Sequence, residues 1–92
     1  MDIGEEDAQA IALRALAYVA EDGERLARFL KTSGIGQQDV LGRLSDPTFL
    51  AGVLDFVLSD DSMTVDFVNR IEIDPMLPRL ARRKLPGAEP DG

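Results

Sequence analysis

The residue types that carry most enzyme chemistry are scarce in this sequence. It has no histidine, the commonest general base, and no cysteine, which excludes thiolate zinc sites, iron–sulfur clusters and cysteine nucleophiles together. The remaining candidates are carboxylates, in the series Asp46, Asp55, Asp60, Asp61, Asp66 and Asp74. No segment has the alternating oxygen ligands around a glycine that a calcium loop requires. We therefore expect no enzyme activity, no metal and no cofactor.

Asp55 differs from the other carboxylates because it interrupts the most apolar segment of the chain. A buried aspartate paired with an arginine would be a candidate for acid–base catalysis, and we keep Asp55 as a candidate buried polar residue. The alternative is a solvent-facing position, or a bond to an arginine or a helix terminus. Asp46, Asp74 and either Asp60 or Asp61 are better explained as helix caps.

A second candidate site is the basic cluster Arg79, Arg82, Arg83 and Lys84, in an otherwise acidic chain. Arg79 and Arg83 are four residues apart and share a helical face, with Arg82 near it, so the three arginines are candidate contacts for a carboxylate-rich or phosphate-bearing partner. The alternative is that these cations suit the C-terminal end of a helix dipole and pair with the acidic body.

A third candidate is a helix-turn-helix over residues 26–44, with Gly34 at the turn and Val40 in the core of the second helix. Gln37, Gln38 and Arg43 would then face DNA. Asp39 within the supposed recognition helix and the lack of a flanking basic cluster argue against it.

The elements that would position these residues are all helical, because no segment keeps the apolar and polar alternation of a strand. The spacing predicts an all-α, compact bundle of five to six short helices in a single domain over residues 1–87, with a disordered tail at 88–92. The helices are expected at 5–21, 22–33, 37–44, 47–59 and 60–71, and from 74 to about 85. The helix near 47–59 is apolar on most sides and should be central.

The helices carry more apolar faces than a chain of this size is expected to bury. The candidates for exposed surface are Leu26, Phe29, Phe49, Phe56, Met63, Phe67 and Met76. An exposed remainder would form a partner groove or a dimer contact, whereas the alternative assigns every one of these residues to the core.

The formal net charge of −7 bears on partners and location. An acidic body repels phosphate backbones and anionic lipids, so we expect neither nucleic acid nor membrane as a partner. The acidic N-terminus lacks the basic residues of a targeting segment, and no apolar run is long enough to span a bilayer, so we expect a cytoplasmic protein.

The Ala-rich first helix, the residues from Arg28 to Ile35 and above all the block from Asp46 to Phe56 resemble a family of small alphaproteobacterial proteins, domain of unknown function 3572. The resemblance extends from about residue 7 to residue 85. It implies a bacterial protein and carries no activity and no site residues.

Together these features favour a non-enzymatic helical protein that binds another protein, or a second copy of itself, through an apolar surface. The alternatives are a DNA-binding regulator using residues 26–44 or the basic cluster, and an enzyme using a buried Asp55 with an arginine.

Overall fold

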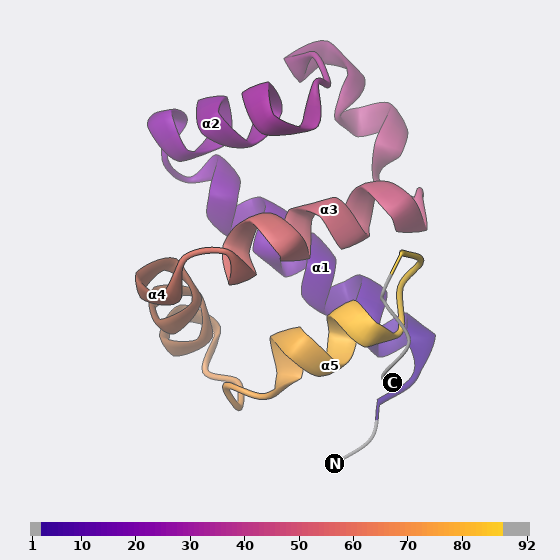
Figure 1. The fold of residues 1–92 in the computed structure, drawn as a ribbon, viewed down its shortest axis with the longest axis vertical. Helices are drawn as coiled ribbons and strands as arrows, with labels where there is room; N and C mark the ends of the chain where they lie inside the picture. The colour runs from indigo at the N-terminus through magenta and orange to yellow at the C-terminus, as the bar shows by residue number, and fades with distance from the viewer. Residues whose placement is uncertain (1–2, 88–92) are drawn as a thin grey trace.

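The computed structural model describes residues 3–87, which form α-helices and short 3-10 turns without a strand. Figure 1 shows α1 passing behind α3, with α2 above them and α5 below. The elements are α1 (Glu5–Ala20), α2 (Gly23–Ser33), the 3-10 turns Gln37–Asp39 and Leu41–Arg43, α3 (Pro47–Leu58), α4 (Asp61–Ile71) and α5 (Leu77–Arg83). The predicted all-α bundle is confirmed. The predicted tail, residues 88–92, lies outside the described residues.

The core forms where α3 and α5 pack against α1. Ala8, Ala12 and Ala15 of α1 are fully buried, and their small side chains let the neighbouring helices approach closely. On α3 the buried side chains are Phe49, Leu50, Ala51, Val53, Leu54 and Val57, which cover more than one face of the helix. The predicted central, apolar helix is therefore confirmed.

Aspartate caps fix where the helices begin. Asp22, Asp46 and Asp60 each accept a hydrogen bond from a backbone amide in the first turn, at 3.0, 2.9 and 3.1 Å. Gly34 ends α2 in the left-handed conformation, with φ of 74°, as expected for a helix C-cap.

The last helix begins later than predicted. Asp74 does accept a hydrogen bond from the amide of Met76 at 2.8 Å, and its carbonyl accepts one from the amide of Leu77 at 2.9 Å. These bonds close a turn, in which Pro75 occupies the second position that proline favours. Helix α5 starts only after that turn, at Leu77.

The predicted helix at 37–44 is wrong. The amides of Asp39 and Arg43 each bond the carbonyl three residues earlier, that of Gly36 and that of Val40, both at 2.9 Å. The segment therefore forms two 3-10 turns. A helix of eight residues gains few hydrogen bonds for the cost of nucleation, and Gly42 adds a cost of roughly 1 kcal/mol relative to alanine.

Candidate protein-binding groove

An apolar groove lies between α1, the first half of α2 and the two 3-10 turns. Its volume is about 490 Å³, within the range of about 300–1,000 Å³ that ligand pockets have. We call it the α1–turn groove, and it is lined by Leu13, Leu16, Ala17, Ala20, Leu26, Gln37, Val40, Leu41 and Leu44. Gln37 is the one polar side chain among these lining residues, so the groove offers van der Waals contact and hardly any hydrogen bonding.

Two leucines of the groove are left in solvent. Leu41 is 79% exposed and Leu13 is 40% exposed, whereas Leu16 is buried and Val40 is half-buried. The 3-10 geometry explains why Leu41 is exposed. A helix over 37–44 would place residues 40, 41 and 44 on one face, whereas the tighter turns direct only Val40 and Leu44 toward the core.

The wall of the groove on α1 is an exposed row of small side chains. Ala17 and Ala20 follow Leu13 at spacings of four and three, and Ala10 continues the row three residues earlier. All four residues are exposed. Spacings of three and four are those at which side chains of one helix contact another helix lying along it, and alanines permit a short distance between the two axes.

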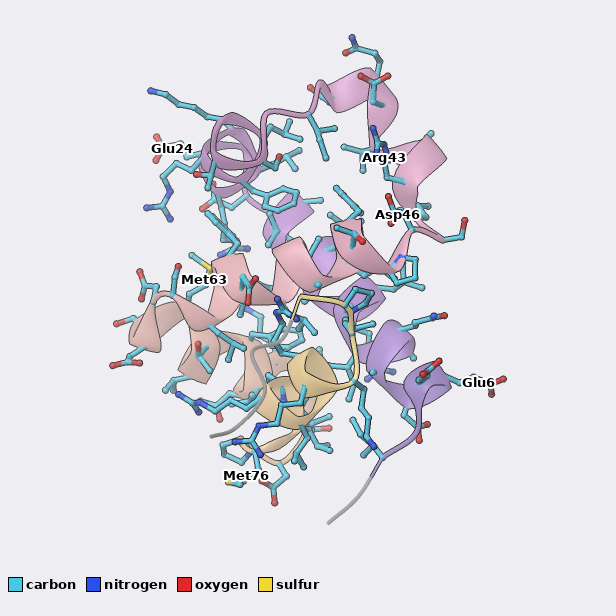
Figure 2. All side chains as sticks on the ribbon, turned by 45° about the vertical axis from the view of Figure 1, so that its right-hand side comes forward. Glu6, Glu24, Arg43, Asp46, Met63 and Met76 are labelled. Carbon is cyan, nitrogen blue, oxygen red and sulfur yellow. The ribbon has the colours of Figure 1, made fainter. Side chains whose placement is uncertain are left out.

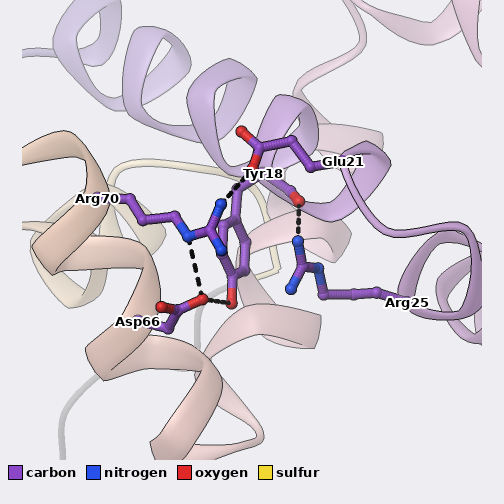
Figure 3. A network of polar contacts seen from close by, with 5 residues as sticks. All are labelled: Tyr18, Glu21, Arg25, Asp66 and Arg70. Atoms are coloured by element: carbon purple, nitrogen blue, oxygen red, sulfur yellow. Dashed lines mark hydrogen bonds and ion pairs between the residues drawn. The ribbon is translucent and has the colours of Figure 1, made fainter.

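A polar network surrounds Tyr18 in the last turn of α1 (Figure 3). The hydroxyl of Tyr18 donates a hydrogen bond to Asp66 at 2.8 Å, and Arg70 binds both Asp66 and Glu21. Arg25 donates to the carbonyl of Tyr18, and its guanidinium lies 3.8 Å from the centre of the Tyr18 ring. These contacts join α1, α2 and α4.

Burial and hydrogen bonds within this network fix the protonation states of Tyr18 and Asp66. Burial and the hydrogen bond to Asp66 both raise the pKa of Tyr18 above its ordinary value of 10.0, so its hydroxyl is neutral and is a poor nucleophile. The hydrogen bond from Tyr18 lowers the pKa of Asp66, which is thereby held as a carboxylate. Among the described residues no three acidic side chains converge to hold a metal ion.

Asp55 is not the buried polar residue it was a candidate for, and the structure shows the alternative, an exposed carboxylate bound to an arginine. Its side chain is 58% exposed, and its Oδ1 lies 2.6 Å from Nε of Arg82, whose side chain is only 16% exposed. The apolar helix tolerates the aspartate because Asp55 lies on the side that meets α5 at its rim. The enzyme hypothesis required a buried Asp55, whereas this side chain is more than half exposed.

The three predicted arginines do not act together. Arg82 also donates to the carbonyls of Leu85 and Pro86, at 3.4 and 3.0 Å, so it holds the chain after α5 and is not free for a partner. Arg79 and Arg83 are exposed and form no hydrogen bond or ion pair within the described residues. They stay candidate contacts, on α5, which lies at the opposite end of the molecule from the 3-10 turns in Figure 1.

The described segment 26–44 has no recognition helix. The turns Gln37–Asp39 and Leu41–Arg43 are too short to fill a major groove, and Arg43 pairs with Asp46 at 3.3 Å (Figure 2). The helix-turn-helix interpretation therefore lacks the element it needs.

Most of the residues named for surplus apolar surface belong to the core, as the alternative had it, although Leu26 lines the groove. Phe29, Phe49, Met63 and Phe67 are buried, and Phe29 packs edge-on against Phe49 and Phe56 with ring centres 5.8 and 5.4 Å apart. Of the residues that sequence analysis singled out, only Met76 is strongly exposed, at 58%. The α1–turn groove was missed because its exposure depends on how residues 37–44 turn.

Comparison with known proteins places the chain in a family. Residues 5–88 match the model of DUF3572, a protein of unknown function. The chain belongs to the DUF3572 family. No curated protein and no solved structure matches this DUF3572 member. Among its described residues no helix is long and apolar enough to cross a membrane.

Proposed function

We propose that this member of the DUF3572 family is a non-enzymatic interaction module that binds a partner protein in the α1–turn groove. The observation that carries the proposal is Leu41, a leucine left 79% exposed at the rim of an apolar groove of about 490 Å³. Burying an apolar side chain away from water is favourable in free energy. Leu41 would be buried when a partner occupies the groove.

The partner is a protein other than a second copy. A stable dimer buries about 800 Å² from each subunit, about a seventh of an accessible surface of 5734 Å². Arg14 and Asp39, both exposed and charged, lie between lining residues in the sequence, so the exposed surface of these two segments is not continuously apolar. Two copies with net charges of −7 also repel each other.

Paired substitutions test the proposal. Leu41→Gln removes an apolar contact in the groove, whereas Val65→Gln changes a comparably exposed residue, at 57%, on α4. Both proteins should fold and unfold like the wild type, because the altered side chains contribute little to the core. Affinity-tagged forms of all three proteins are then used to retrieve partners from cells.

The expected result is a partner that the wild type and Val65→Gln retain and that Leu41→Gln loses. Light scattering across a dilution series should show a monomer in every case. A dimer that dissociates on Leu41→Gln would reassign the groove to self-association, and a partner retained equally by all three proteins would contradict the proposal.

A further inference from the structure

We infer that the occupant of the α1–turn groove is one amphipathic α-helix with apolar residues at helical spacing and basic residues along its flanks. The inference rests on the proposed function and names the chemistry of the partner. It follows from the shape of the groove, from the exposed row on α1 and from the charges beside that row.

The shape of the groove suits a helix. The row Ala10, Leu13, Ala17 and Ala20 extends over ten residues of α1, or about 15 Å at the rise of an α-helix. A second helix laid along this row would pack close to α1, because three of the four side chains are alanines. Its large side chains, at positions i, i+3, i+4 and i+7, would fill the space between α1 and the 3-10 turns.

An extended strand is a poorer fit. Peptides that bind as strands take much of their affinity from main-chain hydrogen bonds to an exposed sheet edge. The described residues form no strand, and α1 satisfies its own backbone groups internally. The backbone groups of a helical ligand are already hydrogen-bonded within the helix, so such a ligand can bind through apolar side-chain contacts alone.

The charges beside the row favour basic flanks. Glu6 lies four residues before Ala10, on the same side of α1, and is exposed. Asp7 is the next residue of α1, whereas Glu21 at the other end of the helix is paired with Arg70, and Arg14 is the one base of α1. On the opposite wall Asp39 is exposed next to Val40. With a net charge of −7 on the whole chain, lysine or arginine on the occupant is attracted and glutamate is repelled.

No described helix of a second copy offers the required face. The large apolar side chains that remain exposed are Leu13, Leu41, Val65 and Met76. Leu13 and Leu41 belong to the groove itself and lie in separate elements. Val65 lies on α4 and Met76 in the turn before α5, so no described helix carries more than one of the four. The occupant therefore comes from another protein.

Three synthetic peptides of about five helical turns test the inference on the full chain. The first carries leucines at positions i, i+3, i+4 and i+7 of each repeat and lysines on the flanks. The second replaces every lysine with glutamate, and the third keeps the lysines and replaces every leucine with serine. Binding is measured by the fluorescence anisotropy of labelled peptide at two salt concentrations.

The leucine–lysine peptide should bind the wild type at least about tenfold more tightly than either of the other two, a difference of about 1.4 kcal/mol. Leu41→Gln should weaken its binding about tenfold and Val65→Gln should not. Ala17→Gln places bulk in the row while keeping a residue that favours helix, and should weaken binding similarly. Higher salt should reduce the advantage of lysine over glutamate.

Equal binding of the lysine and glutamate peptides, or binding that both groove variants leave unchanged, would overturn the inference. So would equal binding of the serine peptide, since attraction would then be purely electrostatic. If no peptide binds but Leu41→Gln still loses a cellular partner, the inference fails and the proposed function stands. If neither effect is seen, both fail.

Discussion

The hydroxyl of Tyr18, in the last turn of α1, donates a 2.8 Å hydrogen bond to the carboxylate of Asp66 on α4, 48 positions later in the chain. The ring of Tyr18 is 3% exposed and packs against Phe67, with ring centres 5.5 Å apart, while the side chain of Asp66 is 47% exposed. This bond ties the side of α1 that faces away from the α1–turn groove to the rest of the bundle, so the groove is framed by a fixed helix.

Tyr18→Phe should lower the free energy of unfolding by about 1 kcal/mol, the net value of one such hydrogen bond. The loss stays small because Asp66 remains in contact with water and with Arg70. Urea denaturation measures this loss in the free energy of unfolding. The pKa of Asp66, followed by NMR, should rise in the variant, and an unchanged pKa would show that the hydrogen bond is not formed in solution.

Alkaline pH should destabilise the protein through the same side chain. The folded-state pKa of Tyr18 lies above 10.0, so its contribution to stability is complete below pH 10.0 and is lost as pH rises through the folded-state pKa. Because Tyr18 is the only tyrosine and the chain has no tryptophan, the near-ultraviolet absorbance of phenolate reports this one group. A midpoint at or below 10.0 would contradict the burial of Tyr18.

Acid pH should also destabilise the protein, through Asp66. Its folded-state pKa lies below 3.8, so the stability it contributes is present above pH 3.8 and is lost as pH falls through the folded-state value. Asp66→Asn should flatten this part of the profile of unfolding free energy against pH. A profile identical to the wild type below pH 3.8 would rule out the contribution.

Arg82→Ala should cost about 1–2 kcal/mol, because it removes the bond to Asp55 and two bonds to carbonyls after α5. Arg83→Ala is the matched control: the neighbouring exposed arginine should change stability by less than about 0.5 kcal/mol. Thermal unfolding distinguishes the two. Equal effects would mean that Arg82 does not anchor the end of α5.

The sequence predicted the helices best where local chemistry decides. Asp46 and Asp60 cap helices in the structure as their short carboxylates indicated, and Gly34 ends α2 in a conformation that glycine adopts easily. Helix α3 is central because most of its side chains are apolar, so that burying them requires neighbours on more than one side.

Features that depend on how the chain turns and packs could not be predicted from the spacing of apolar residues. The end of α4 at residue 71 was predicted, but not that Glu72 closes it with φ of 54°, in a role that glycine usually takes. The exposure of Leu41 depends on a local competition between one α-helical turn and two 3-10 turns. The separation of Arg82 from Arg79 and Arg83 depends on where α5 lies against α3, which spacing along one helix does not reveal.

Glu72→Gly should therefore stabilise the protein, by up to about 1 kcal/mol, because it relieves the steric cost of a left-handed conformation in a residue with a Cβ. The greater entropy of the unfolded chain offsets part of that gain. The melting temperature should rise by a few degrees. Glu24→Gly, at an exposed position in α2, should lower it, and a fall in both variants would exclude strain at Glu72.

The central claim, that the α1–turn groove is a protein-binding surface, is tested most directly by photo-crosslinking in the cells that naturally produce the protein. A photoreactive amino acid is placed at position 41 in one protein and at position 65 in another, both exposed and on different sides of the bundle. The account predicts one discrete crosslinked partner from position 41 and none from position 65. No adduct from position 41, or the same adducts from both positions, would contradict it.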